Sequence, residues 1–241
     1  MPYEVHPCHP TDAPSISQCM VLARLTDPHW AFLFTDPSAA PILANNTRRF
    51  PHNLTSNRPA RRHEKILDTT SDQAIAYARW TLPPSLVAKG DVWLSAQVAE
   101  PTSDEKERFK RDFDGASDSA GRMPGMKGGG LSEFRSGPLE RAEEGVLGGL
   151  KKGEEVLTLE YLTTHPDFWR RGAGSMLVRN GTDIADQYGL KTYVMSEPAG
   201  LKVYLNHGFK VVDTVEVDYS AFGGEEVQVH YFLLREPVAA S

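Results

Sequence analysis

Residues 170–175, with the sequence RRGAGS, bring two arginines and two glycines together at the start of a predicted helix. An amphipathic pattern indicates that this helix covers residues 172–188. Glycine allows a backbone to turn sharply and to approach a ligand, and the first turn of a helix presents free N–H groups at the positive end of its dipole. The two arginines add formal positive charge. Such a loop is suited to binding a phosphate or pyrophosphate group.

The spacing of the glycines argues against two well-known kinds of phosphate-binding site. The P-loop pattern GxxxxGK(S/T) does not occur in the chain, so hydrolysis of a nucleoside triphosphate is not expected. A dinucleotide fingerprint that starts at Gly172 requires a third glycine at position 177, where the chain has Leu177. That fingerprint also belongs after the first strand of a domain, whereas these residues lie far along the chain. A dinucleotide-binding oxidoreductase is therefore a less favoured alternative.

The elements that would position the loop are predicted on both sides of it. A strand over residues 156–163 precedes it, and its alternation places Glu160 on the face opposite Leu159 and Tyr161. In the following helix, Gly181 costs about 1 kcal/mol relative to alanine, which a close approach to a sheet would explain. Further strands are predicted over residues 191–196, 209–217 and 227–234, with a short helix over residues 199–207. This alternation indicates a mixed α/β sheet.

Taken in this order, the residues resemble the GNAT superfamily of acyl-CoA-dependent N-acetyltransferases. Motif A of that family reads Q/R-x-x-G-x-G/A, and residues 169–174 here read WRRGAG. Residues 199–209 match the motif AGxxxYxxxGF that follows in the family, and residues 77–80, YARW, are similar to fungal members. The resemblance implies an α/β (α+β) fold with a mixed, mostly antiparallel central sheet flanked by helices.

The resemblance also implies one N-acetyltransferase domain over residues 1–241, with an acetyl-CoA-binding core over residues 156–209. Residues 85–155 contain too few apolar residues for a second core, so they are expected to form an insertion before the cofactor-binding strand. Within it, residues 115–130 are rich in Gly, Ser, Asp and Met without an apolar period, which favours a mobile loop. A short helix is expected over residues 138–150.

The N-terminal part gives weaker signals. Strands are predicted over residues 3–6, 65–68 and 74–82, and a helix over residues 11–25. Three prolines between residues 27 and 44 predict that this segment is mostly loop.

For the cofactor, the resemblance implies that residues 162–164 offer backbone groups to the pantetheine arm of acetyl-CoA and that residues 170–175 hold its pyrophosphate. The expected cofactor-binding residues are Leu162, Thr163, Thr164, Arg170, Arg171, Gly172, Ala173, Gly174, Ser175, Glu197, Ala199 and Tyr204. The first position of motif A, usually Gln or Arg, is Trp169. The contribution that this position usually makes to pyrophosphate binding must therefore come from Arg170, Arg171 and the backbone amides.

For catalysis, Tyr204 is the expected general acid, because many family members use this tyrosine to protonate the departing CoA thiolate. Its ordinary pKa of about 10 is comparable to that of a thiolate. The alternative is that Leu201, Tyr204 and Leu205 only form the buried stripe of their helix. Glu160 is the expected base for the ammonium group of the substrate, with Glu197 as a second choice. The alternative for Glu160 is a solvated or structural carboxylate.

These residues predict transfer of an acetyl group from acetyl-CoA to a primary amine, on a small molecule, a protein or a peptide, by direct attack in a ternary complex. A non-catalytic acyl-CoA sensor is the main alternative, since it would keep the loop without needing Glu160 or Tyr204. No metal is expected, because Cys8 and Cys19 match neither a zinc site nor a redox pair.

Composition restricts the partners. The net charge of -6 is unlike the basic face of a nucleic-acid-binding protein. No apolar run approaches the ~20 residues that span a bilayer, and the first residues lack the pattern of a signal peptide. The expectation is a cytoplasmic protein, with the nucleus as the alternative, that acts as a monomer or homodimer without nucleic acid or membrane.

Overall fold

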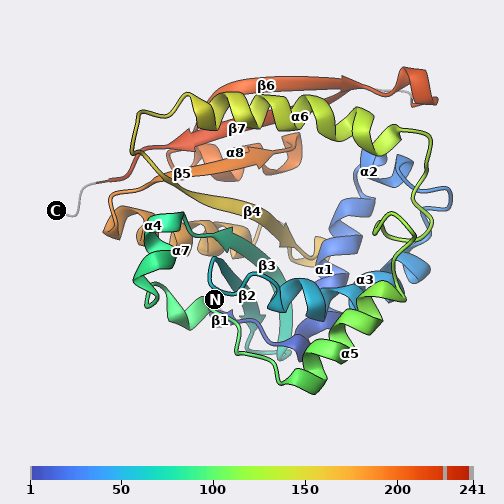
Figure 1. Cartoon of the computed structure of the whole chain (residues 1–241), viewed down its shortest axis with the longest axis horizontal. Helices are drawn as coiled ribbons and strands as arrows, with labels where there is room; N and C mark the ends of the chain where they lie inside the picture. Colours follow the sequence, from blue (N-terminus) through green and yellow to red (C-terminus); the bar gives the residue numbers. More distant parts are fainter. Residues whose placement is uncertain (1, 225–226, 239–241) are drawn as a thin grey trace.

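A computed structural model describes residues 2–224 and 227–238 of the chain. They form a seven-stranded sheet in the order β1-β2-β3-β4-β5-β7-β6 (Figure 1). The strands are β1 (Tyr3–Pro7), β2 (Arg61–Asp68), β3 (Gln73–Thr81), β4 (Val156–Thr164), β5 (Lys191–Ser196), β6 (Lys210–Asp218) and β7 (Val227–Arg235). Neighbouring strands are antiparallel except β4 and β5, which are parallel. The predicted mixed, mostly antiparallel sheet is confirmed.

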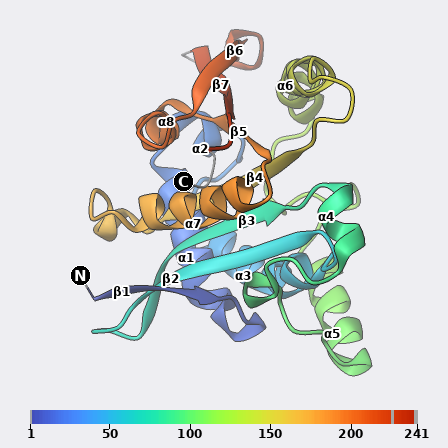
Figure 2. The same ribbon diagram turned by 90° about the vertical axis from the view of Figure 1, so that its left-hand side faces the viewer.

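Helices cover both faces of this sheet. They are α1 (Ala13–Leu25), α2 (Pro28–Phe32), α3 (Ala39–Thr55), α4 (Pro84–Lys89), α5 (Ser103–Asp114), α6 (Leu131–Gly148), α7 (Ala173–Gln187) and α8 (Pro198–Leu205), with 3-10 turns at Pro10–Asp12, Leu94–Ala96, Pro166–Phe168 and Ser220–Phe222. Figure 2 shows α7 and α8 on one side of the sheet, with α3 and α6 on the other. We call these the α7 face and the α1 face, because α1 also packs on the second side against β3 and β4.

The α7 face holds the larger core, in which Trp80 of β3, Leu159 of β4 and Leu177 of α7 are buried together. A Cβ atom on Gly181 would lie 2.1 Å from the ring of Trp80. The predicted reason for a glycine inside this helix is therefore confirmed, since α7 can reach the sheet only where the residue has no side chain.

The α1 face has a core of its own, in which Ile16 of α1, Phe50 of α3 and Tyr77 of β3 are buried. The expectation of a loop over most of residues 27–44 is wrong, because α3 begins at Ala39 and continues through Pro51. Its residues Ile42, Asn46, Phe50 and Leu54 recur every four positions and are all buried. Burial of this stripe outweighs the hydrogen bond that a proline removes from a helix.

Residues 85–155 contact both faces of the sheet, since Leu86, Val92 and Trp93 pack in the core of the α7 face and Leu131 and Leu139 in a cluster on the α1 face. Their longest helix, α6, starts at Leu131 rather than near residue 138, and it packs on β6 and β7. The loop over residues 115–130 stays outside helices and long strands, but it is not detached from the protein. Its Gly125 carbonyl accepts a hydrogen bond from the Thr35 amide at 2.9 Å, and Met123 and Met126 pack against a hydrophobic cluster. The expected loop therefore has defined contacts, made by its methionines and backbone.

Candidate active site

The loop over residues 170–175 joins the Pro166–Phe168 turn to the start of α7. Gly172 lies in the left-handed region with a φ of 87°, and Arg170, which is not a glycine, also has a positive φ of 61°. The first amide of this region bonded within the helix is that of Met176, which donates to the Gly172 carbonyl. The amides of residues 172–175 thus precede the helical hydrogen-bond pattern, so this junction has the form of an anion site.

Trp169 takes the place of the usual Gln or Arg and binds to the protein itself. Its indole N–H donates to the Thr164 carbonyl at 2.7 Å, while 44 % of the residue stays exposed. The guanidinium of Arg171 lies 5.2 Å from the centre of the Phe168 ring. Trp169 therefore ties the loop to the end of β4, which is a positioning role rather than a charge role.

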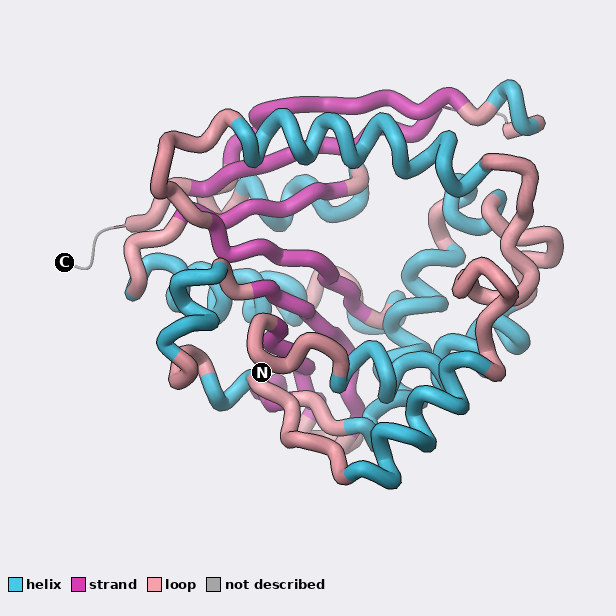
Figure 3. The backbone as a smooth tube through the Cα atoms, in the orientation of Figure 1, coloured by secondary structure: helices cyan, strands magenta, loops and turns pink. Residues whose placement is uncertain are grey.

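The strands β4 and β5 pair only over the first four residues of each. Val156 is paired with Lys191 and Leu159 with Val194, after which β5 continues with β7 alone. Figure 3 shows the two strands side by side at the left and separating towards the right. Within the described part of the chain, the β5-facing edge of β4 over residues 160–164 has no strand partner. Such an edge can bind an extended group that carries amides, in the manner of an added strand.

A β-bulge marks the start of this divergence. Arg79 of β3 pairs with Tyr161 and Trp80 pairs with Leu159, so Glu160 is the extra residue on β4. As a result Tyr161 packs against the core of the α1 face, whereas Leu159 belongs to the α7 face. The prediction that Leu159 and Tyr161 share a face is therefore wrong, because regular alternation assumes a strand without a bulge.

Beyond the bulge, the end of β4 packs against both faces. A Cβ atom on Gly174 would lie 3.5 Å from the Thr164 hydroxyl and 3.9 Å from the Leu162 side chain, so both residues face the start of α7. Thr163 points the other way, and its hydroxyl donates to the Cys19 carbonyl of α1 at 2.9 Å. Helix α1 and the phosphate-type loop are thus both held to the strand edge that is free.

Tyr204 lies on α8 and is buried in the core of the α7 face. Its ring meets Phe209 edge-on at 5.7 Å, and a Cβ atom on Gly200 would come within 3.2 Å of it. Burial raises the pKa of Tyr204, the nearby Glu197 raises it further, and Arg24 opposes the shift. The hydroxyl is therefore protonated at neutral pH, which allows it to act as a proton donor.

Glu160 is fully engaged by neighbouring side chains. Thr81 donates to its Oε1 at 2.7 Å, and Arg79 approaches its Oε2 at 2.6 Å, with Arg61 at 3.6 Å from the same oxygen. The side chain is 26 % exposed. Glu160 would have to give up part of these contacts in order to bind a proton.

Glu197 follows β5 directly and precedes α8. Its Oε1 lies 3.3 Å from Arg24 of α1 and 3.5 Å from Arg135 of α6. Arg24 also donates to the Tyr161 hydroxyl at 3.2 Å. Desolvation acts to lower the pKa of Arg24, but Tyr161, Glu197 and Asp27 more than offset this and raise it. Four segments that are far apart in the sequence therefore meet at the end of β5.

Two of these contacts, those made by Arg24 and Arg135, were not predicted from the sequence. Arg24 lies at the end of an ordinary amphipathic helix, and Arg135 lies in the segment expected to be an insertion. No spacing rule links positions this far apart, so only a covarying set of related sequences could have indicated the pair.

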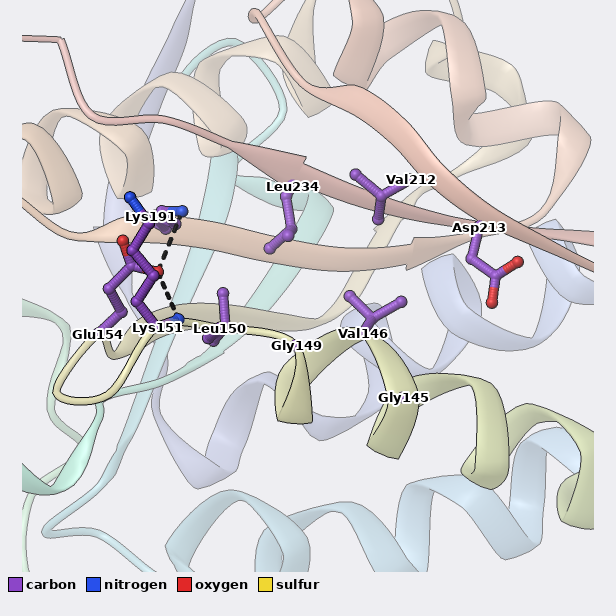
Figure 4. A pocket seen from close by; sticks show the side chains of 10 residues that line it. All are labelled: Gly145, Val146, Gly149, Leu150, Lys151, Glu154, Lys191, Val212, Asp213 and Leu234. Carbon is purple, nitrogen blue, oxygen red and sulfur yellow. Dashed lines mark hydrogen bonds and ion pairs between the residues drawn. The ribbon is translucent and has the colours of Figure 1, made fainter.

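A separate open pocket of about 420 Å³ lies between α6 and the strands β5, β6 and β7. Its lining contains Lys151, Glu154, Lys191, Val212 and Leu234, and the dashed contacts in Figure 4 join Glu154 to the two lysines. None of the predicted site residues lines it. This pocket is thus not the place where the motif residues gather.

Neither a metal centre nor a membrane span is found in the described ranges. No group of three His, Cys, Asp or Glu residues there is arranged to hold a metal ion. No helix among residues 2–224 and 227–238 is long and apolar enough to cross a membrane.

The loop, the divergent strands and Tyr204 fall in one stretch that a family model also matches. Residues 141–209 match the model described as the acetyltransferase (GNAT) family. Over this stretch the chain is similar to the GNAT family. The resemblance stated from motif A is confirmed, and the match supports an acyltransferase. No curated protein matches this chain in sequence.

Solved structures share the fold of this chain at low sequence identity. A Corynebacterium glutamicum protein described as histone acetyltransferase HPA2 and related acetyltransferase is 15 % identical, with a TM-score of 0.55 over 100 % of this chain and 99 % of that chain. The C-terminal condensation domain of Ebony, solved with beta-alanyl-dopamine, is 12 % identical, with a TM-score of 0.56 over 97 % and 98 % of the two chains. The ribosomal-protein-S5-alanine acetyltransferase from Vibrio fischeri is 9 % identical, with a TM-score of 0.50 over 98 % and 93 %. At these identities the likeness establishes the fold alone.

Proposed function

We propose that this protein transfers an acetyl group from acetyl-CoA to a primary amine by direct attack in a ternary complex. One observation carries the proposal. The free edge of β4 over residues 160–164 leads, through a turn, into the loop whose amides precede α7. A strand edge followed by an anion site matches a ligand that has amide groups at one end and a pyrophosphate at the other.

The residues present fit this cofactor. Backbone groups of Leu162, Thr163 and Thr164 would bind the pantetheine arm, and the amides of residues 172–175 would bind the pyrophosphate. Arg170 and Arg171 add the formal charge that offsets the anion. When bound, acetyl-CoA supplies an activated thioester whose carbonyl carbon is open to attack.

In the proposed reaction, the amine first loses a proton to a carboxylate, since only the neutral nitrogen carries a free electron pair. The nitrogen then forms a bond to the thioester carbonyl carbon while the bond from carbon to sulfur breaks. Tyr204 gives its proton to the departing thiolate. The nitrogen loses a second proton as the amide forms, and this proton restores Tyr204, while the proton first taken up by the carboxylate passes to solvent. Burial keeps Tyr204 protonated until the thiolate departs.

Two carboxylates are candidates for the proton acceptor. Both oxygens of Glu160 are bound, by Thr81 on one side and by Arg79 on the other. The Oε2 atom of Glu197 has no partner among the described residues, and Glu197 acts electrostatically on Tyr204. We therefore propose Glu197 as the acceptor and Glu160 as a residue that positions the bulge. A larger loss of kcat in Glu160→Gln than in Glu197→Gln would reverse this order.

The protein's own thiols do not enter the scheme. Cys8 and Cys19 are both buried. Desolvation raises the pKa of Cys8 well above its ordinary value and that of Cys19 to about 12. Neither is ionised at neutral pH, so no acyl-cysteine intermediate is needed. Their burial also means that CoA thiol released in solution can be titrated with little background.

The test combines binding with turnover. Acetyl-CoA at 100 Kd should stabilise the protein by about 2.7 kcal/mol in a thermal shift experiment. Thiol release with a panel of primary amines should then show turnover that depends on protein concentration. Stabilisation by NAD(P) without stabilisation by acetyl-CoA would overturn the proposal. Stabilisation by acetyl-CoA with no thiol release over the whole panel would favour the acyl-CoA sensor instead.

A further inference from the structure

Two arginines from distant segments meet at one carboxylate beside the proposed reaction site. Arg24 and Arg135 both approach the Oε1 atom of Glu197, and Arg24 also binds the hydroxyl of Tyr161. We call Arg24, Arg135, Tyr161 and Glu197 the arginine cluster. It joins α1, α6, β4 and the end of β5, and it rests on the α1 face, opposite the loop of residues 170–175.

The arginine cluster differs from a structural ion pair in the same molecule. Arg235 binds Asp186 through two parallel hydrogen bonds of 2.7 Å each, with its side chain 9 % exposed. In the arginine cluster, both guanidiniums share one oxygen at 3.3 and 3.5 Å, and the side chains of Arg24 and Arg135 are 30 % and 23 % exposed. Each guanidinium has five N–H donors. The arginine cluster thus keeps donors that can bind an anion.

A second observation also points to a ligand here. His230 of β7 is fully buried, and neither of its ring nitrogens has a hydrogen-bond partner among the described residues. Burial lowers its pKa to about 4, and Arg135 and Arg24 lower it while Asp27 opposes them. A neutral imidazole close to these charges can both donate and accept a hydrogen bond. Buried polar groups are rarely left without a partner in native proteins, so a bound group is expected here.

Two positive and two negative side chains lie in this region. Arg24 and Arg135 carry positive charge, and Glu197 and Asp27 carry negative charge. Asp27 is already bound by the amide and ring of His29 and by the Gln228 side chain. The carboxylate of Asp27 therefore has partners within the protein, whereas Glu197 and the two arginines keep hydrogen-bonding groups that are free to bind a ligand.

We propose that the acceptor is a zwitterionic amine, an amino acid or a compound like one, whose carboxylate is bound by Arg24 and Arg135 while its amine lies at Glu197. The proposal rests on the proposed acetyl transfer and names its substrate class. An arginine binds a carboxylate better than any neutral group does, since the two planar groups match in charge and shape. Arg135 makes residues 85–155 part of the specificity-determining surface.

The first test needs no variant. Each amino acid is paired with the primary amine that lacks only its carboxylate, such as leucine with isopentylamine and phenylalanine with phenethylamine. We expect kcat/KM to be at least about ten-fold higher for the amino acid in at least one pair, because each charged contact contributes roughly 1.5–3 kcal/mol. Equal or better turnover of the decarboxylated amine in every pair would overturn the proposal.

Variants then test the assigned residues. Arg135→Gln and Arg24→Gln should each raise KM for the preferred amino acid and lower its advantage over the decarboxylated amine by about ten-fold. Arg135→Lys should recover part of that advantage, since it restores the charge without the planar fork. Arg141→Gln removes an exposed arginine from the same helix and should leave the advantage unchanged. An advantage that survives both glutamine variants would remove the two arginines from this role.

The outcomes separate this inference from the proposed function. Turnover of decarboxylated amines alone would sustain acetyl transfer and reject the zwitterionic acceptor. Failure of acetyl-CoA to bind at all would reject the proposed function itself. Should Arg135→Gln not fold, as seen from its melting curve, the comparison of amino acids with amines on the unmodified protein still decides the proposal.

Discussion

The two faces of the sheet approach the divergence of β4 and β5 in different ways. On the α7 face, one continuous stretch supplies the loop of residues 170–175 and the start of α7, and its binding groups are largely backbone amides. On the α1 face, the arginine cluster is made of side chains from four segments. Backbone amides can bind the parts that all acyl-CoA donors share. Side chains, in contrast, can distinguish one amine acceptor from another. The predictions below test this division, beginning with the largest effect.

The first prediction concerns the anion site on the α7 face. Gly174→Glu should abolish CoA binding, with a Kd raised by more than about a hundred-fold, because it adds a negative charge where the pyrophosphate is proposed to bind. Isothermal titration with CoA measures this. Gly174→Ala is the matched control, since its Cβ would meet Thr164 at an ordinary 3.5 Å. Normal CoA affinity in Gly174→Glu would remove the loop from the cofactor site.

A second prediction tests how closely α7 must approach the sheet. Gly181→Ala should destabilise the protein by about 3 kcal/mol, because the new Cβ would lie 2.1 Å from the buried Trp80 ring. For a chain of this size that corresponds to a melting temperature roughly 6–12 °C lower. Gly145→Ala on α6 has open space around it and serves as the control. An unchanged melting temperature for Gly181→Ala would show that the contact is not a tight one.

Tyr204 is the proposed proton donor, so its substitution should separate cofactor binding from the chemical step. Tyr204→Phe should lower kcat by about 10–100-fold and leave the Kd for CoA nearly unchanged, because it removes a proton donor while keeping the ring in its core position. Steady-state kinetics and titration with CoA measure the two quantities. If kcat is unaffected, Tyr204 is only part of the buried stripe of α8.

The last prediction concerns the pKa values of two neighbouring residues of β2 that face opposite sides of the sheet. Burial raises the pKa of Glu64 to about 7, although Asn180 and Trp93 lower it, and burial lowers the pKa of His63 to about 3. Glu64 holds its proton more tightly in the folded state, so its stabilising effect is present below pH 4.5 and is lost as the pH rises towards 7. His63 acts in the opposite direction, since folding weakens its hold on a proton and stability falls as the pH drops from 6.5 towards 3.

Denaturant unfolding across the pH range checks both signs. Glu64→Gln should remove about 2–3 kcal/mol of the loss in stability between pH 4.5 and 7.5. His63→Gln should flatten the acid side of the curve and leave the neutral side unaltered in slope. Identical slopes for Glu64→Gln and the unmodified protein would mean that the pKa of Glu64 is the same in the folded and unfolded states.

How far the sequence could predict this protein is clearest where periodicity and motif are local. The strands from residue 156 onwards, α7, the loop of residues 170–175 and the closeness of Gly181 to the sheet all follow from patterns within short windows. The prediction was wrong for segments whose structure depends on contacts with residues far away in the sequence. Helix α3 forms through Pro51 because its buried stripe requires a partner surface that only the folded protein provides. The bulge at Glu160 depends on the register of β3, so alternation within β4 could not reveal it.

By itself, then, the sequence determined the fold class, the resemblance to the GNAT family and the position of the glycine-rich loop before α7, since each of these depends on contiguous residues whose geometry is set by local hydrogen bonding. The tertiary structure alone decided that β4 separates from β5 after Leu159 and that Glu160 and Tyr161 turn to the α1 face. It also decided that Arg24 and Arg135 meet at Glu197. Contacts between residues that lie far apart in the sequence arise from packing of whole elements, and no short window of sequence contains that information.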